Sequence, residues 1–406
     1  MTTDMHVIVV GGGIGGMAAA LLIARTGASV TLLERVSAPA DVGAGLLLQP
    51  NGLAVLHGLG LGKELGGHAI HAAEVRRSDG RLVMHAPITD HGPGLDHVLA
   101  VRRSRLYRLL YDEIARSGRI TTHLGAEVVA ADPSGEVHLA DGQQSLAADL
   151  VIGADGVHSV IRDCGGFDAV VTDTGASYLR ATVEGCEVGL HGEYWTKLGL
   201  FGGAPLGDGS TYFYAAAQAP GVAAAMSRRD LPALRALWAE ELPLTAALLE
   251  AVPTYDDLLV NGVSRVDAKR WSHGALVLLG DAAHAMSPTL GQGANTALVD
   301  AAVLADELEL NDTVGDAVQR YVRRRRSSVR KVQDAADRVA RLSNTHDQLR
   351  TSAIDLSMRV FTAFKPVAAR QDRLVQQEDP ATLRAVVTRL GAGVVISPDL
   401  PGDSNG

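Results

Sequence analysis

The chain has 406 residues, of which 47% are hydrophobic and 20% are charged. This composition is typical of a globular protein, and the length favours two domains over a single core. The formal net charge of −9 disfavours nucleic acid or an anionic membrane as the main partner. One dense basic run, Arg323 to Arg326, lies in a helical pattern, and we interpret it as a solvated or acid-paired helix face.

Cys164 and Cys186 are the only cysteines, and their positions match no metal or redox spacing. We therefore expect no bound metal and a reducing, cytoplasmic location. The stretch from Val7 to Ala24 is uncharged and long enough to raise the question of a membrane span. Its glycine-rich middle and the lack of a preceding basic segment favour a buried strand that turns into a helix.

The N-terminal part predicts a strand, a helix and a second strand. His6–Val10 is a continuous apolar run, Met17–Arg25 has a helical pattern and Ala28–Leu33 is again apolar. Together they form a βαβ unit of about 30 residues. Further elements follow in chain order: a helix beginning after Pro50, a hairpin over 72–85, a helix over 101–115, short strands over 120–146 and a buried strand over 149–154.

The pattern changes between about residues 167 and 270. Strand-like runs over 177–184, 193–201 and 211–216 are joined by turns rich in glycine, proline and aspartate. A helical stretch over 231–249 follows. We interpret this part as an antiparallel sheet that carries the substrate. A buried strand over 275–279 and helices over 296–308 and 316–342 complete the predicted elements, and the end of the chain, 391–406, is expected to fray.

The first motif is Gly11-x-Gly13-x-x-Gly16, at the turn between the first strand and helix. Gly11 permits the tight turn, Gly13 lets the backbone approach a pyrophosphate, and Gly16 lets helix and strand pack closely. The phosphates would lie at the helix N-terminus. Glu34, some 20 residues on, can accept hydrogen bonds from ribose hydroxyls and would repel a 2′-phosphate, so NADP is disfavoured in this groove.

Two further motifs follow strands. Asp155-Gly156-x-x-Ser159-x-x-Arg162 ends a strand and opens a helix, and its spacing alone supports a structural role in which Ser159 and Asp155 bind backbone donors. In Gly280-Asp281-Ala282-Ala283-His284-x-x-x-Pro288, Asp281 emerges at the carboxyl end of a parallel strand, where ligands bind in such folds. The alternative for Asp281 is a plain helix cap.

In this order the three motifs resemble the class A FAD-dependent aromatic hydroxylases, over about residues 1–165 and 270–345. The resemblance implies an α/β (α+β) fold, with a Rossmann-like FAD-binding domain interleaved with an antiparallel-sheet substrate domain and followed by C-terminal helices. We assign 1–70, 100–166 and 271–345 to the FAD-binding domain, 71–99 and 167–270 to the substrate domain, and 346–406 to a C-terminal helical segment.

The resemblance also implies the cofactor site. Arg103 matches the arginine that reaches FAD, with Arg102 as the alternative if the register is one residue off. Asp281 would bond the ribityl chain, and the loop from Pro288 to Asn295 would pass close to the isoalloxazine ring. The predicted cofactor-binding residues are Gly11, Gly13, Ile14, Gly15, Gly16, Glu34, Arg35, Gly43, Ala44, Arg103, Asp155, Asp281, Pro288, Gly291, Gly293, Ala294 and Asn295.

The function implied is that of a monooxygenase that uses FAD, NADH or NADPH, and O₂ to hydroxylate an aromatic or polycyclic small molecule through a flavin C4a-hydroperoxide. The flavin carries this chemistry, so no protein nucleophile is required. Epoxidation, Baeyer–Villiger insertion, an isoprenoid-type reductase of the same fold and a flavin-holding protein that only sequesters a small molecule remain alternatives. We expect a monomer or a homodimer.

Candidates for the substrate pocket come from the central strands and from the proline beside the flavin. They are Tyr178, Arg180, Trp195, Phe201, Tyr212, Tyr214 and Pro288. Strand aromatics also form ordinary core, so each of these residues can either pack in the core or contact the substrate. Arg180 can bind a substrate carboxylate or serve as a salt-bridged scaffold residue. His191, His273 and His284 are possible bases, of which His284 is expected to be structural.

Overall fold

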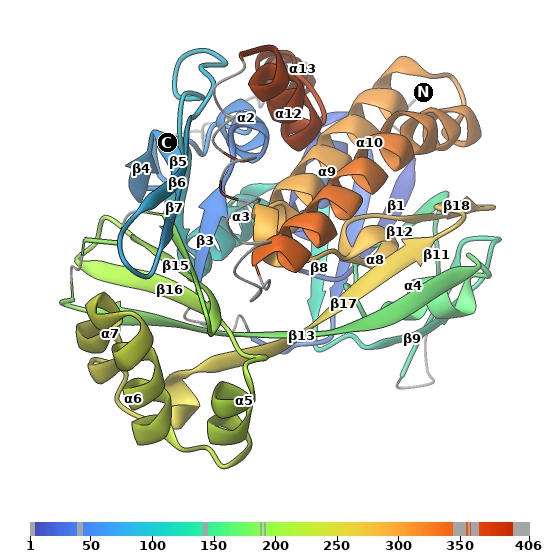
Figure 1. Ribbon diagram of the computed structural model, residues 1–406. Helices are drawn as coiled ribbons and strands as arrows, with labels where there is room; N and C mark the ends of the chain where they lie inside the picture. The colour runs from blue at the N-terminus through green and yellow to red at the C-terminus, as the bar shows by residue number, and fades with distance from the viewer. Residues whose placement is uncertain are drawn as a thin grey trace, which may run out of the picture.

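The computed structural model describes residues 5–38, 44–140, 145–186, 189–190, 192–343, 355, 358 and 365–392. Within these residues the chain is a mixed α/β structure that combines parallel and antiparallel sheets (Figure 1). The predicted fold class is thereby confirmed. None of the described helices combines the length and the apolar character that crossing a membrane requires.

A six-stranded sheet forms the centre of the nucleotide-binding part. Val7 of β1 is in register with Val30 of β2 and with Leu150 of β12, and β1 runs parallel to both of these neighbours. These strands are buried, which explains why their sequences are continuously apolar. In spatial order the strands are β18 (Ser272–His273), β19 (Leu276–Leu278), β12 (Leu150–Gly153), β1 (His6–Val10), β2 (Ser29–Glu34) and β8 (Ile120–Leu124).

Helices of this part share one hydrophobic core with the sheet. The helix predicted to start at Thr296 begins three residues earlier, so Gly293, Ala294 and Asn295 form its first turn and are not a loop. The helices are α1 (Ile14–Arg25), α2 (Pro50–Gly58), α3 (Arg103–Arg116), α4 (Val160–Cys164), α8 (Asp281–His284), α9 (Gly293–Leu310), α10 (Val314–Ser343), α12 (Lys365–Gln376) and α13 (Pro380–Ala392).

A seven-stranded sheet forms the second large layer. The single strand predicted over 193–201 is a hairpin of two strands, and the strand predicted to start at Ser177 begins at Ala169. In spatial order the strands are β17 (Leu259–Ala268), β13 (Ala169–Glu184), β16 (Ser210–Ala216), β15 (Gly199–Pro205), β14 (Glu193–Thr196), β5 (Ala72–Arg77) and β6 (Leu82–Pro87). The long pair β13 and β17 runs along the molecule toward the parallel sheet (Figure 1).

The two faces of the seven-stranded sheet have different surroundings. Three helices cover its outer face: α5 (Pro220–Ser227), α6 (Leu231–Glu241) and α7 (Ala246–Glu250) (Figure 1). The helix predicted over 231–249 is interrupted at Pro243, where a short 3₁₀ turn separates α6 from α7. The opposite face, called the inner face below, contacts residues of the nucleotide-binding part.

Two small sheets complete the structure. The first, β3 (Gly45–Leu48), β7 (Val98–Arg102) and β4 (His68–Ile70), is antiparallel, and it packs against Tyr212 of the inner face. The second consists of β9 (Val128–Ala131), β10 (Glu136–Leu139) and β11 (Ser145–Ala147). The small β3 sheet thus lies at the junction of the two large layers.

Candidate functional site

The glycine loop between β1 and α1 has the geometry of an anion site. Gly11 has φ +104°, and a Cβ on it would lie 2.5 Å from the Ala154 carbonyl oxygen. A Cβ on Gly13, in contrast, would meet no atom within 4 Å, so the backbone there is open to a ligand. No side chain caps the start of α1. Its first N–H groups are therefore not capped by a described side chain, and the helix dipole there favours a phosphate.

Other predicted residues of this loop serve packing in the structure. A Cβ on Gly16 would lie 1.9 Å from the Gly11 carbonyl oxygen, and one on Gly15 would lie 2.9 Å from Ala297 of α9. The Ile14 side chain is buried in the core. These residues can offer a cofactor their backbone only, whereas the side chain of Arg35 is exposed beside the loop.

Glu34 ends β2 next to the glycine loop. Its Oε2 accepts a hydrogen bond from the Gly12 N–H at 2.6 Å, and its Oε1 accepts one from the Val36 N–H at 2.8 Å. Each carboxylate oxygen can accept a further hydrogen bond. The side chain is therefore fixed in place and retains acceptor capacity for a ribose.

The second motif joins the loop to the third motif. Ser159 caps α4 by accepting from the Arg162 N–H at 3.0 Å, as predicted, and Asp155 Oδ2 accepts from the Ile161 N–H at 3.2 Å. Burial raises the pKa of Asp155, and its Oδ1 is buried without a hydrogen-bond partner in the structure. Arg162 donates to the Ala282 carbonyl at 3.3 Å. An orphaned acceptor thus points to a donor that a ligand would supply.

Asp281 and Arg103 lie close enough for their charges to act on each other. Solvent reaches both side chains, yet the protein around them raises the pKa of Asp281 and lowers the pKa of Arg103 by desolvation. A group that is both solvent-reached and desolvated lies in a recess and not on a convex surface. Arg102 points elsewhere, because it pairs with Glu184 and Asp208. Of the two arginines considered from the sequence, Arg103 is therefore the one that lies near Asp281.

The loop after Asp281 borders the same recess. The Gly293 Cβ position is 4.0 Å from Asp281 Oδ1, and no side chain caps the 18-residue helix α9 that begins there. Pro288 is exposed, and Gly291 has φ +60°. The Asn295 side chain is fully engaged with protein, since it donates to the carbonyls of Leu47 and Gly291 and accepts from the Gln49 N–H. The Asn295 side chain can therefore hold the loop in place, but these protein partners leave it no free donor for the cofactor.

The pocket candidates separate between the two faces of the large sheet. Tyr178, Trp195, Tyr212 and Tyr214 belong to the inner face, where Tyr212 and Tyr214 have ring centroids 5.7 Å apart. Phe201 is on the outer face, fully buried against Phe213 and Trp238. Alternation along β15 places it there, so the prediction that it lines the pocket is wrong.

Arg180 also lies on the inner face. Its Nη2 donates to Asn261, and its charge acts on Arg103 and Tyr212. Its Nε is buried and has no hydrogen-bond partner in the part of the chain that the structure describes. Asn261 is neutral, and no carboxylate pairs with Arg180 among the described residues. The alternative of a salt-bridged scaffold arginine therefore does not hold here.

The predicted histidines have structural partners or lie elsewhere. His284 is buried, with Nε2 2.5 Å from Asp300 Oδ2, and its Nδ1 has no hydrogen-bond partner among the described residues. His273 Nδ1 lies 2.8 Å from the Gly165 carbonyl oxygen. His191 and Gly43 lie outside the described residues, whereas Ala44 is buried and its carbonyl accepts from the Arg103 N–H at 2.9 Å.

Sequence reasoning missed a carboxylate on the inner face. Glu193 Oε1 accepts from the Tyr214 hydroxyl at 2.9 Å, and its Oε2 accepts from Trp195 Nε1 at 3.2 Å. Burial raises its pKa. A signal was present in the sequence, because a residue two positions before Trp195 in a strand shares its face. Glu193 and Trp195 both lie in β14, before the turn that divides the predicted strand, so this alternation is unaffected by the turn.

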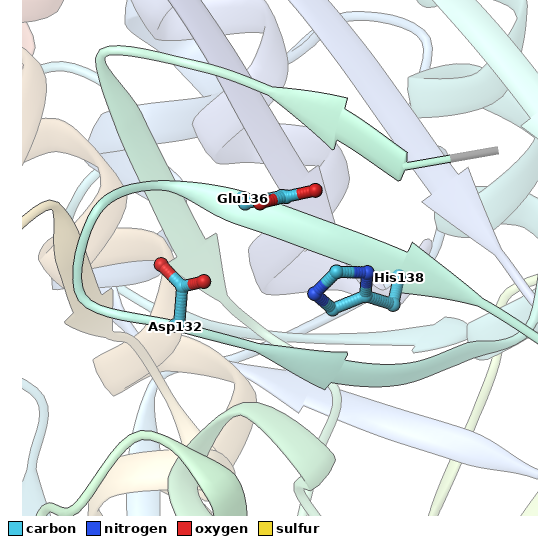
Figure 2. A group of neighbouring side chains, drawn as sticks. All are labelled: Asp132, Glu136 and His138. Atoms are coloured by element: carbon cyan, nitrogen blue, oxygen red, sulfur yellow. The ribbon is translucent and has the colours of Figure 1, made fainter.

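One small cluster could resemble a metal site. Asp132, Glu136 and His138 lie together on the β9–β10 hairpin (Figure 2). Asp132 Oδ1 already accepts from the N–H and the hydroxyl of Ser134, which closes the turn. The position of Asp132 is explained by its role in this turn, and we assign no metal site to the cluster.

A model of the FAD binding domain family matches residues 4–336. The chain belongs to this family of FAD-dependent monooxygenases. The flavoprotein is 31% identical over 332 residues to the aurachin C monooxygenase/isomerase of Stigmatella aurantiaca, covering 79% of this chain and 85% of that protein. It is also 31% identical over 354 residues to the 2-heptyl-3-hydroxy-4(1H)-quinolone synthase of Mycobacteroides abscessus, covering 85% and 92%.

Solved structures agree with this assignment. The tetrameric form of 2-methyl-3-hydroxypyridine-5-carboxylic acid oxygenase superposes with a TM-score of 0.75 at 27% identity, covering 93% of this flavoprotein and 98% of that chain. The predicted family, enzyme class and FAD cofactor are confirmed. The roles of individual site residues stay predictions.

Proposed function

We propose that this monooxygenase takes its electrons from NADH or NADPH and hydroxylates a small aromatic ring held between the inner face and the recess at Asp281. One juxtaposition supports the proposal. Tyr178 of the inner face lies beside Ser287, the residue before Pro288, and Tyr212 packs against Gly45 of β3. The aromatic face therefore adjoins the segments that the family uses for its flavin.

Residues of the three sequence motifs, together with Glu34 and Arg103, would hold the cofactor. Gly13 and the start of α1 would receive the pyrophosphate, and Glu34 the adenosine ribose. Asp155 Oδ1, buried and unpartnered, and Asp281, solvent-reached inside a recess, would accept hydrogen bonds from the rest of FAD. Arg103 would reach the cofactor from the start of α3.

FAD, when bound, supplies the redox chemistry, in which a nicotinamide reduces it and one oxygen atom of O₂ is transferred to the ring. The chain contributes orientation and exclusion of water. Tyr178, Trp195 and Tyr212 are each less than a tenth exposed and provide apolar walls. Arg180, with its unpaired Nε, would hold an anionic or carbonyl oxygen of the substrate.

The substrate class follows from the relatives and from these walls. The names of the relatives given above contain a 4(1H)-quinolone and a hydroxypyridine carboxylic acid. We propose an aromatic ring of this size, either phenolic or nitrogen-heteroaromatic. The tyrosines and Trp195 of the inner face can stack on such a ring, while polar groups fix its edges.

The test is a panel of phenols, quinolones and hydroxypyridines offered to the purified yellow protein. We expect one class to accelerate NADH or NADPH oxidation and O₂ uptake together, with a product that has gained one oxygen atom by mass spectrometry. Turnover without O₂ would indicate a reductase. Ring binding that leaves NADH and NADPH oxidation unchanged would indicate a sequestering protein. A protein that takes up no FAD would overturn the proposal.

A further inference from the structure

Glu193 is a carboxylate without a cation. Both of its recorded donors are neutral groups, the Tyr214 hydroxyl and Trp195 Nε1. Burial raises its pKa, and no Lys, Arg or His opposes that effect among the residues that the structure describes. The residue as a whole is nevertheless only half-buried. A desolvated carboxylate that remains reachable is available to a donor from outside the chain.

The backbone register explains how Tyr214 reaches Glu193. Glu193 pairs with Gly202 of β15, and Gly202 pairs with Tyr214 of β16. A Cβ on Gly202 would lie 2.5 Å from the Tyr214 Cζ. The missing side chain therefore lets the tyrosine ring lie across β15 and bond the carboxylate two strands away. Directly opposite residues share one face of a sheet, so the whole row belongs to the inner face.

The row of paired residues that starts at Glu193 ends at the guanidinium of Arg180. Tyr214 pairs with Arg180 of β13, so Glu193, Gly202, Tyr214 and Arg180 follow one another across four strands. At strand spacings of about 4.8 Å, the backbones of its two ends are about 14 Å apart. Within the described part of the chain, Arg180 has no carboxylate partner and Glu193 has no cationic partner. The row is thus polarised, with an aromatic ring between opposite charges.

The row faces the proposed substrate space. Tyr178, in the adjacent row, lies beside Ser287, the residue before Pro288. Glu193 raises the pKa of this tyrosine, which places the two groups near each other, although burial is the larger cause of the shift to about 12. The carboxylate therefore lies on the side of the sheet that faces the loop at Pro288.

We propose that Glu193 is a specificity-determining residue, which accepts a hydrogen bond from a ring N–H of a nitrogen-heteroaromatic substrate. This inference rests on the proposed function and selects within its substrate classes. A carboxylate without a cation binds a ring that donates an N–H more tightly. It binds a ring with an oxygen lone pair at the same place more weakly. Tyr214 and Trp195 position the carboxylate for this contact.

The experiment compares matched rings on the FAD-loaded enzyme. Dissociation constants are measured by the change in the flavin absorption spectrum for 4(1H)-quinolone against 4-chromone and for 4(1H)-pyridone against 4-pyrone, in which an oxygen replaces the ring N–H. We expect wild type to prefer the N–H ring by about 10-fold or more. Glu193→Gln should reduce that preference to about threefold or less, with unchanged FAD content.

Two further variants keep the outcome interpretable. Tyr214→Phe retains the carboxylate but removes its orienting bond, and it should give an intermediate preference even if Glu193→Gln folds poorly. Glu250→Gln, whose side chain is 77% exposed, is the matched control and should keep the wild-type preference. A preference that survives Glu193→Gln, or a wild type that turns over rings without any preference, overturns the assignment and leaves the monooxygenase proposal standing. A wild type that binds FAD but no aromatic ring defeats both.

Discussion

Arg325 lies inside the protein, within a run of four arginines whose pattern is that of a solvated or acid-paired face. Its Nε donates to Asp300 Oδ1 at 2.7 Å, and the other oxygen of Asp300 lies 2.5 Å from His284 Nε2. Its neighbour Arg324 pairs with Asp306 and Glu378. The acid-paired interpretation therefore holds for these two arginines. The pair of Arg325 with Asp300 connects α10 to α9, and His284 links the same aspartate to α8.

Removing the cation of this pair should destabilise the protein strongly. Arg325→Met leaves Asp300 buried with one fewer partner, and we expect the free energy of unfolding to fall by about 3–5 kcal/mol. Urea denaturation of the FAD-loaded protein measures it. Arg326→Met, at an exposed position of the same run, is the control and should change stability by less than about 0.5 kcal/mol. Equal losses in the two variants would contradict the role of the buried pair.

The same carboxylate predicts a pH dependence. Burial would raise the pKa of Asp300, but the charges of His284 and Arg325 outweigh it and hold the pKa below its ordinary value of 3.8. The folded state thus favours the charged form, so its contribution is fully present above pH 3.8 and is lost as the pH falls through the lower folded value. The stability difference between wild type and Asp300→Asn should shrink below about pH 3.8 in urea titrations. A difference that grows on acidification would refute this.

At the scale of elements, the contact between β3 and β16 joins the two large layers. A Cβ on Gly45 would lie 2.2 Å from the Tyr212 Cγ, so strand and ring approach as closely as a glycine allows. Tyr212 is in turn in ring contact with Tyr214 of the Glu193 row. Small backbone changes in β3 therefore reach the proposed substrate face.

Gly45→Ala should displace the Tyr212 ring. We expect substrate affinity to fall by about tenfold, because ring-positioning errors of about 1 Å are costly, while FAD content stays at the wild-type level. Spectral titration with the best ring from the substrate panel measures the affinity. Gly118→Ala, where the added Cβ meets no atom within 4 Å, serves as control. Loss of FAD without a change in ring affinity would argue against this account of the contact.

At the scale of the whole molecule, the C-terminal helices belong to the nucleotide-binding part. Leu383, Val387 and Leu390 of α13 are buried in the core that also contains α1 and α2. Gln377 donates to Gln292 and Thr296 at the start of α9. The range assigned to a C-terminal helical segment thus contributes to the same core through its described stretch 365–392.

Leu390→Ala tests that integration. The side chain is 1% exposed, and its truncation should cost about 2–5 kcal/mol. If α13 is part of the common core, unfolding followed by far-ultraviolet circular dichroism and by flavin fluorescence should shift together. A separate early transition in the circular dichroism signal alone would mean that α13 docks independently.

The amino-acid sequence by itself determined the motifs and the elements around them. Apolar runs such as His6–Val10 must be buried on both faces, and the glycines that follow fit one tight turn, so local chemistry was sufficient there. The tertiary structure alone decided which side of a strand faces the site. The break between β14 and β15 and the 3₁₀ turn at Pro243 come from hairpin and helix packing, which short-range periodicity does not encode.

Phe201 and Glu193 illustrate the difference. Both lie in one predicted strand, but the register across β14, β15 and β16 sends the phenylalanine into the helix-covered core and brings the glutamate to Tyr214. Arg325 is a third case, because only the packing of α10 on α9 reveals Asp300 as its partner. Pairing partners far apart in the chain are fixed by contacts across strands and helices, and a linear pattern carries no distance between them.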